Sequence, residues 1–116
     1  MDCLFCKIIE GKIPSTKVYE DQKILAFYDI QKLAKIHILF IHKKHCSNIN
    51  AMMEEDISKV SEIFIAITKY TKQHGLEEKG FRIVTNTGPD AGQTIFHTHF
   101  HLLAGGPLGA LGAFRK

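Results

Sequence analysis

The sequence has few cysteines and prolines, no tryptophan and no long hydrophobic run. Its three cysteines are an odd number, which argues against a disulfide framework and favours thiols or metal ligands in a reducing compartment. The apolar stretch 36–41 is too short to cross a membrane and is interrupted by His37. The N-terminus lacks a basic segment followed by a continuous apolar one, so we do not expect a signal peptide. These absences predict a cytoplasmic protein without a membrane-spanning segment.

The sequence also lacks a concentration of charge of one sign. Its formal net charge is +3, and its lysines are spread along the chain, so anionic ligands are favoured but no basic stripe forms. We therefore expect no dedicated nucleic-acid binding. A hydrophobic content of 45% with 23% charged residues indicates a folded globular protein. Without a linker or repeat, residues 1–116 are predicted to form one domain that ends in a tail at 107–116.

Short apolar patterns predict five strands and two helices. Strands are expected at 18–20, 24–29, 36–41, 81–85 and 95–103, with a short helix at 5–9. Between 51 and 74 the apolar residues recur at helical spacing, and Gly75 follows, which predicts one long helix. The pattern indicates an α+β fold in which an antiparallel five-stranded meander sheet packs against the long helix, with a short N-terminal helix.

Three histidines at intervals of two residues form the most informative motif. On an extended strand, His97, His99 and His101 would share one face with Ile95, while Phe96, Thr98, Phe100 and Leu102 would take the other face, toward the core. A buried unpaired polar group costs roughly 1–3 kcal/mol, so three imidazoles in register indicate chemistry more than packing. The spacing alone is equally compatible with a metal site and with catalysis.

A glycine-containing loop at 86–94 precedes the histidines. Gly88 and Gly92 would let backbone N–H groups approach phosphate oxygens, although a hairpin turn uses the same residues for geometry alone. Beside three imidazoles, such a loop supplies the parts that phosphoryl or nucleotidyl transfer needs.

From Asn86 to Gly106 the sequence is similar to the signature of the histidine-triad nucleotide-binding family, through the run Gly92-Gln93-Thr94-Ile95-Phe96-His97-Thr98-His99-Phe100-His101-Leu102-Leu103. The resemblance extends over nearly the whole chain, with similar residues at Phe5, 7–9, 13–15, 18–21, 26–30, His37 and 43–45. It is closest to the Hint-like branch of small nucleoside phosphoramidate and acyl-nucleotide hydrolases. Departures are Thr98 in place of an aliphatic residue, His42 in place of a proline, no proline at 30–36 and no tryptophan in the tail.

The resemblance implies a catalytic mechanism and a set of site residues. His99 would attack the α-phosphorus of an AMP or GMP derivative and form a nucleotidyl-histidine intermediate that water hydrolyses. His97 and His101 complete the triad, His37 would orient it, and Thr94 would protonate the leaving amine. Phosphate contacts fall to Asn86, Gly92, Gln93, Thr94 and His101, ribose contacts to Asp29, and base contacts to Phe5, Ile8, Ile13, Phe27 and Ile30.

Without the resemblance, these nucleoside-binding residues have ordinary interpretations. Phe27 and Ile30 could belong to the core, and Asp29 could begin a turn. Two other function classes also stay open: a nucleotide-binding or scaffolding module with vestigial activity, and a zinc-stabilised RNA-binding protein. RNA binding is the weakest, because the sequence has no aromatic stacking platform with interleaved basic residues.

Cys3 and Cys6 form a C-x-x-C pair, which alone could be a zinc half-site, a redox pair or two small apolar residues. Bacterial members of the resembled family that carry such a pair imply a structural zinc ion held by Cys3, Cys6, His45 and His97. Cys46 is predicted to be a buried apolar residue. The resemblance also implies a symmetric homodimer, with the long helix and a sheet edge as the buried surfaces.

Overall fold

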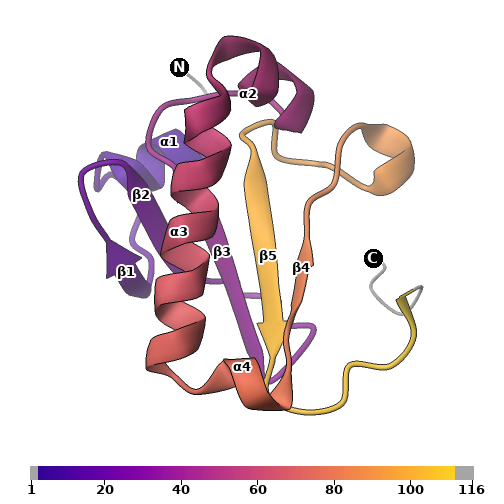
Figure 1. Ribbon diagram of the computed structural model, residues 1–116. Coiled ribbons are helices and arrows are strands. Elements are labelled where there is room, and N and C mark those ends of the chain that lie inside the picture. The colour runs from indigo at the N-terminus through magenta and orange to yellow at the C-terminus, as the bar shows by residue number, and fades with distance from the viewer. Residues whose placement is uncertain (1–2, 112–116) are drawn as a thin grey trace.

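A computed structural model describes residues 3–111 of the 116-residue chain. Its five strands form one antiparallel sheet in the order β1-β2-β3-β5-β4 (Figure 1). The strands are β1 Lys17–Glu20, β2 Ile24–Tyr28, β3 Ile36–His42, β4 Arg82–Val84 and β5 His99–Ala104; the helices are α1 Leu4–Ile9, α2 Ile49–Glu55, α3 Ile57–Gln73, α4 Leu76–Lys79 and the 3-10 helix η1 Pro89–Ala91. The predicted α+β fold is confirmed; β5 lies between β3 and β4 instead of following β4 at the edge.

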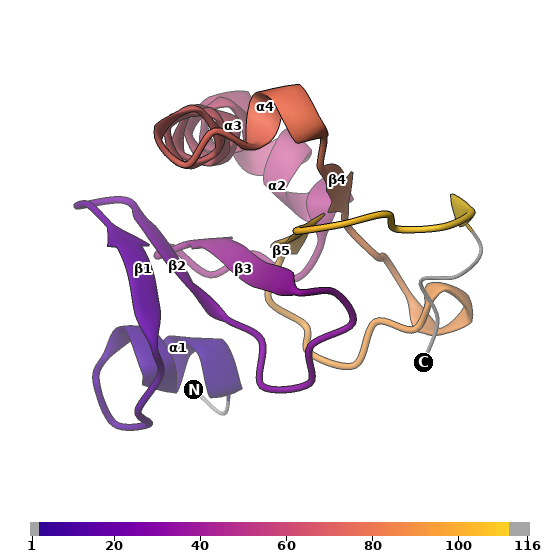
Figure 2. The ribbon, with the colours of Figure 1, turned by 90° about the horizontal axis from the view of Figure 1, so that it is seen from below.

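Helices cover both faces of the sheet. Figure 2 shows α2, α3 and α4 on one side and α1 on the other. Along β3, Ile38 and Phe40 pack into the core under α3, whereas Leu39 and Ile41 pack into a second core with α1. A central strand that is buried on both faces needs a continuous apolar run, which 38–41 supplies. Among the helices at 3–111, none is both long and apolar enough to cross a membrane.

The helix predicted at 51–74 is wrong as a single element, because the chain breaks at Asp56 into α2 and α3. Asp56 has an extended backbone with φ −165° and ψ 104°. Its Oδ1 accepts hydrogen bonds from the Ser58 backbone N–H at 3.0 Å and from the Ser58 hydroxyl at 2.6 Å. This N-cap begins a new helix within an apolar pattern that continues across the break.

The predicted histidine strand is four residues too long at its start, since β5 begins at His99. Thr98 ends the preceding loop, and both its backbone N–H and its hydroxyl donate to the Cys46 carbonyl, at 2.7 and 3.0 Å. His97 therefore does not share a strand face with His99 and His101. Thr98 is buried as predicted, but Phe96, expected in the core, is 56% exposed.

Candidate functional site

The main cavity, of about 1510 Å³, opens on the face of the sheet that carries α1. Every residue predicted to bind nucleotide lines it: Phe5, Ile8, Ile13, Phe27, Asp29, Ile30, Asn86, Gly92, Gln93, Thr94, His99 and His101. Ile30 is 97% exposed and therefore lies at the rim. The structure thus brings together residues from opposite ends of the sequence in one concave site of the kind that binds small molecules.

One wall of the main cavity is apolar and centres on α1. Phe5 and Ile8 are buried against Phe27 and Leu39, and the Phe5 ring meets Phe27 edge-on with centroids 5.5 Å apart. Sequence reasoning missed Leu39, which lines the cavity and pairs with His101 across β3 and β5. The strand alternation of 36–41 carried that signal, because Leu39 falls on the same face as His37.

The opposite wall is the loop that contains Gly88 and Gly92, both of which have positive φ, 85° and 83°. Gln93 is buried and holds this loop from within: its Oε1 accepts the Gly88 N–H at 2.9 Å. Its Nε2 donates to the carbonyls of Ser47 at 2.8 Å and Ile95 at 3.2 Å. The Gln93 side chain therefore braces the loop whose backbone N–H groups were predicted to face phosphate.

His99 is held in one tautomer by its own chain. Its Nδ1–H donates to the His97 carbonyl at 2.7 Å, so in the neutral ring the lone pair is on Nε2. Burial lowers the pKa of His99 below the usual imidazole value, which favours this neutral form at neutral pH. The edge of Phe5 covers the ring, with centroids 5.1 Å apart. The site therefore presents an uncharged imidazole, the nucleophilic form of the side chain.

A second chain of hydrogen bonds sets the tautomer of His101. The Leu33 backbone N–H donates to His37 Nδ1 at 3.1 Å, so the proton of neutral His37 is on Nε2. This Nε2–H donates to His101 Nδ1 at 2.9 Å and lies 3.4 Å from Asp29 Oδ2. His101 consequently carries its own proton on Nε2 and can donate it to an anion. Asp29 also forms the expected turn, since its Oδ1 accepts the Gln31 N–H at 2.8 Å.

The four predicted metal ligands converge beside this cavity. In this group, which we call the Cys–His cluster, the four ligand atoms of Cys3, Cys6, His45 and His97 all lie within 4.8 Å of one another. His97 Nδ1 is 3.2 Å from His45 Nδ1, 3.4 Å from Cys3 Sγ and 3.6 Å from Cys6 Sγ. A tetrahedral zinc ion with usual bond lengths separates its nitrogen and sulfur ligands by roughly 3.3–3.8 Å. The nitrogen–sulfur separations of 3.4–3.6 Å fall within that range, and the nitrogen–nitrogen separation of 3.2 Å lies just below it.

The protonation of the cluster also suits a cation. The His97 Nε2–H donates to the His42 carbonyl at 2.9 Å, which leaves the lone pair on Nδ1, toward the sulfurs. Burial lowers the pKa of His97 to about 4, so the ring is neutral at pH 7. Burial and the neighbouring Cys3 raise the pKa of Cys6 to about 11, a penalty on its thiolate that a bound divalent cation reverses. Cys46 is buried outside the cluster, as predicted.

Similarity to known proteins agrees with this arrangement. The HIT domain pattern matches residues 10–108. The chain belongs to the HIT family. It is similar to a histidine triad protein from Clostridium difficile, with 45% identity and a TM-score of 0.90 over 95% of this chain and 96% of the other. A HIT family hydrolase from Clostridium thermocellum gives 42% identity and a TM-score of 0.88 over 94% and 95%. A histidine triad nucleotide-binding protein from Candida albicans gives 37% and 0.80 over 87% and 73%.

In this HIT chain the three triad histidines have three separate environments. His97 joins the Cys–His cluster, His99 faces the main cavity beside Phe5, and His101 pairs with His37. His42 stands in place of a proline of the resembled family and bonds to α3: its Nε2–H donates to Glu62 Oε1 at 2.9 Å. That contact fixes the strand end whose carbonyl orients His97.

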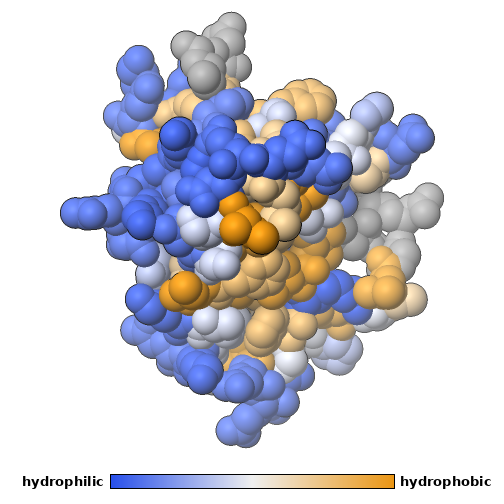
Figure 3. Space-filling view, turned by 45° about the horizontal axis from the view of Figure 1, so that its top comes forward, coloured by the Kyte–Doolittle hydropathy of each residue, from blue (hydrophilic) through white to orange (hydrophobic). Residues whose placement is uncertain are grey.

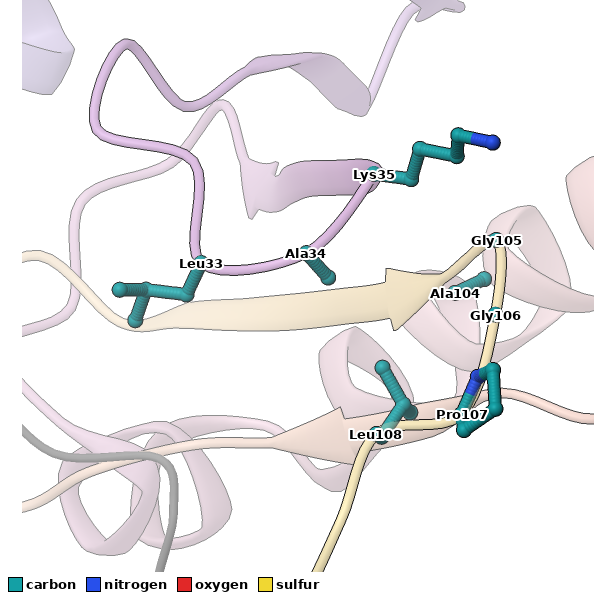
Figure 4. Close-up of a pocket in the computed structure, with 8 residues that line it drawn as sticks. All are labelled: Leu33, Ala34, Lys35, Ala104, Gly105, Gly106, Pro107 and Leu108. Carbon is teal, nitrogen blue, oxygen red and sulfur yellow. The ribbon is translucent and has the colours of Figure 1, made fainter.

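A small hollow of about 240 Å³ lies apart from the triad (Figure 4). It is lined by residues 33–35, which precede β3, and by residues 104–108, which follow β5. A Cβ at Gly105 would lie only 2.7 Å from Cβ of Lys35, so this approach requires glycine. Of the predicted tail, residues 107–111 are described and none lines the main cavity; residues 112–116 lie outside the described part. The tail thus begins near the segment that orients His37.

Proposed function

We propose that this HIT chain is a purine-nucleotide hydrolase or transferase that cleaves nucleoside phosphoramidates or acyl-nucleotides through a nucleotidyl-His99 intermediate. One observation carries the proposal: the His99 Nδ1–H donates a hydrogen bond of 2.7 Å to the His97 carbonyl. The neutral ring therefore has its lone pair on Nε2, and His99 lines the main cavity. Among the similar structures, one is named a HIT family hydrolase and another a histidine triad nucleotide-binding protein, which supports hydrolysis and nucleotide binding, respectively.

The proposed first step is attack of His99 Nε2 on the α-phosphorus. A phosphorus–nitrogen bond to the imidazole forms as the bond to the leaving group breaks, and the electron pair departs with the amine or carboxylate. The Thr94 hydroxyl at the cavity wall would pass a proton to the leaving amine and recover one from water. His101 Nε2–H and backbone N–H groups near Gly92 would stabilise the negative oxygens of the transition state.

The proposed second step returns His99 to its starting form. Water attacks the phosphorus and gives up a proton to solvent, the phosphorus–nitrogen bond breaks, and the imidazole recovers its electron pair while the nucleoside monophosphate leaves. Because Nδ1 keeps its proton, the nucleotidylated ring is an imidazolium cation, and its imidazole is a good leaving group because departure restores a neutral aromatic ring.

The nucleoside would bind against the apolar wall that centres on α1. Phe5, Ile8, Ile13 and Phe27 offer apolar surface to a purine, with Ile30 at the rim, and Asp29 offers a carboxylate to the ribose hydroxyls. Asn86, the first residue of the loop 86–94, lines the same cavity.

Steady-state hydrolysis of adenosine 5′-phosphoramidate, with release of AMP and amine, tests the proposal. Turnover that saturates with substrate and is inhibited by AMP is the expected result. AMP binding without turnover of phosphoramidates or acyl-adenylates would overturn the enzymatic proposal and favour the nucleotide-binding or scaffolding module instead.

The Cys–His cluster is proposed to bind one structural zinc ion through Cys3, Cys6, His45 and His97. The donor set of two sulfurs and two nitrogens and the separations of 3.2–3.6 Å support this proposal. Four protein ligands would complete a tetrahedron and leave no position for substrate, which is typical of a structural site.

A homodimer is proposed through α3 and the edge strand β4. In Figure 1, α3 lies over β2 and β3 and leaves β5 and β4 beside it. Ile57, Phe64 and Ile65 on α3 are 64%, 38% and 53% exposed. Figure 3 shows apolar residues gathered near the middle of one face, with hydrophilic residues around them. A second copy could cover this face and pair with β4.

Sedimentation equilibrium of Phe64→Glu tests the proposed homodimer, with Lys12→Glu as the control, because Lys12 is exposed and follows α1 on the other side of the sheet. Dissociation of the Phe64 variant alone is expected, and a concentration-independent monomer mass of the wild type would refute the proposal.

A cytoplasmic location is also proposed, since three cysteines, an odd number, favour thiols or metal ligands in a reducing compartment.

A further inference from the structure

The six-residue helix α1 carries parts of two sites at once. Cys3, its N-cap, and Cys6 belong to the Cys–His cluster, whereas Phe5 and Ile8 line the apolar wall of the main cavity. A displacement of α1 would therefore move the base-binding surface and the two sulfur ligands together.

The side chains of Phe5 and Ile8 pack α1 against the sheet. Within the segment itself, Lys7 N–H donates to Cys3 O, and the N–H groups of Lys12 and Ile13 donate to Lys7 O. A helix of this length has little stability of its own in water, because nucleation costs more than so few hydrogen bonds return. Its position depends on the packing of Phe5 and Ile8 and on the Cys–His cluster.

His97, from the other half of the cluster, is fixed by hydrogen bonds of the chain itself. The His97 Nε2–H donates to the His42 carbonyl at 2.9 Å, and Thr98 donates twice to the Cys46 carbonyl. His97 is fully buried between these anchors. The backbone at the start of β5, including the carbonyl that orients His99, is thus held by hydrogen bonds that need no metal ion.

From this asymmetry we infer that metal occupancy of the Cys–His cluster sets the affinity of the main cavity for the nucleobase, by fastening α1, while the phosphate half of the site stays formed without metal. The inference rests on the proposed function. It assigns Cys3 and Cys6 as positioning residues for Phe5 and Ile8 toward a purine base.

The test compares two ligands that differ by the base. AMP and ribose 5-phosphate are titrated calorimetrically into the full chain, once zinc-loaded and once stripped by a chelator, with zinc content measured in both preparations. Stripping is expected to weaken AMP binding about tenfold or more and ribose 5-phosphate binding less than about twofold. Restoring zinc should restore AMP affinity.

Hydrogen exchange on the same samples reports the structural cause. Amides of α1 should lose protection on stripping, whereas amides of β3 and β5 should keep it. Loss of protection throughout the sheet would overturn the inference, since the cluster would then support the whole fold. Equal AMP affinity with and without zinc would overturn it while leaving the proposed function intact. Absence of AMP binding in both forms would overturn the proposed function together with the inference.

Cys3→Ser gives the same comparison without a chelator. A serine hydroxyl can still accept the Cys6 N–H at the start of α1, as Cys3 Sγ does at 3.4 Å, but it is a poor zinc ligand. The variant should lose zinc and AMP affinity together and keep ribose 5-phosphate affinity. Cys46→Ala is the matched control, because Cys46 is a buried thiol outside the cluster, and it should retain both zinc and AMP.

Discussion

The two walls of the main cavity are held by different kinds of interaction. The wall proposed to bind phosphate is the loop 86–94, which is fixed by hydrogen bonds from the Gln93 side chain. Thr98, just before β5, donates two hydrogen bonds to the Cys46 carbonyl. The wall proposed to bind the nucleoside centres on the six-residue helix α1, which packs on the sheet through Phe5 and Ile8. Cys6 of this helix and its N-cap Cys3 belong to the Cys–His cluster. Chemistry and nucleotide affinity should therefore respond to different perturbations.

Replacement of the nucleophile should separate chemistry from binding most completely. His99→Ala is expected to lower kcat for adenosine 5′-phosphoramidate by at least roughly 10³-fold, because it removes the attacking nitrogen. AMP affinity should stay within about threefold, since Asp29, Phe27 and Ile8 remain. Steady-state kinetics and calorimetry check the two quantities, and undiminished turnover by the variant would eliminate the mechanism.

Zinc binding to the Cys–His cluster should release protons from its thiols. The pKa of Cys6 is raised to about 11 without metal, so its thiol is protonated at pH 7 and must lose that proton to bind. The pKa of His97 is about 4, so that ring contributes no proton. We expect at least about one proton released per zinc at pH 7, and weaker zinc binding as pH falls. Calorimetry in buffers of different ionisation enthalpy measures this number; zero released protons would exclude Cys6 as a ligand.

Removal of the N–H that orients His37 should affect chemistry more than binding. Leu33→Pro deletes the donor to His37 Nδ1, which frees the other tautomer and weakens the donor role of His101. We expect kcat to fall about tenfold and AMP affinity to fall less than about threefold, because His101 is one of several proposed phosphate contacts. Leu33→Ala keeps the N–H and is the control. Imidazole ¹⁵N shifts of His37 and His101 should report a changed tautomer only in the proline variant, and unaltered shifts there would contradict the assignment.

The low-pH limb of the kcat/KM profile should report the lowered pKa of His99. Only the neutral ring attacks, and burial lowers its pKa, so activity should persist below the ordinary imidazole pKa of about 6.5 and be lost as pH falls through the lowered value. Phe5→Ala uncovers the ring and should move this limb of the kcat/KM profile upward, toward 6.5. A limb at or above 6.5 in the wild type would contradict the burial argument.

The sequence predicted the residues of the site better than the elements that carry them. Strand alternation and the family resemblance brought His99, His101 and Asp29 to one cavity. Strand alternation alone was wrong at His97, because side-chain and backbone hydrogen bonds from Thr98 to the Cys46 carbonyl keep residues 97 and 98 outside β5, and such a contact has no local sequence pattern. The resemblance did place His97 beside Cys3, Cys6 and His45. Asp56 divided a helix whose apolar periodicity is uninterrupted. The hydrogen bond from the Leu33 N–H to His37 Nδ1 could not be predicted from the sequence, since every residue except proline has a backbone N–H.

The most direct test of the account is to locate the covalent intermediate. Wild-type protein mixed with a phosphoramidate of AMP, quenched within one turnover and digested, should yield a peptide spanning 97–101 that carries one adenylyl group. Fragmentation should place that group on His99, and both stripped protein and Cys3→Ser should form the adduct at saturating substrate. An adenylyl group on another residue, or turnover in which no adduct accumulates under any quench condition, would contradict the account.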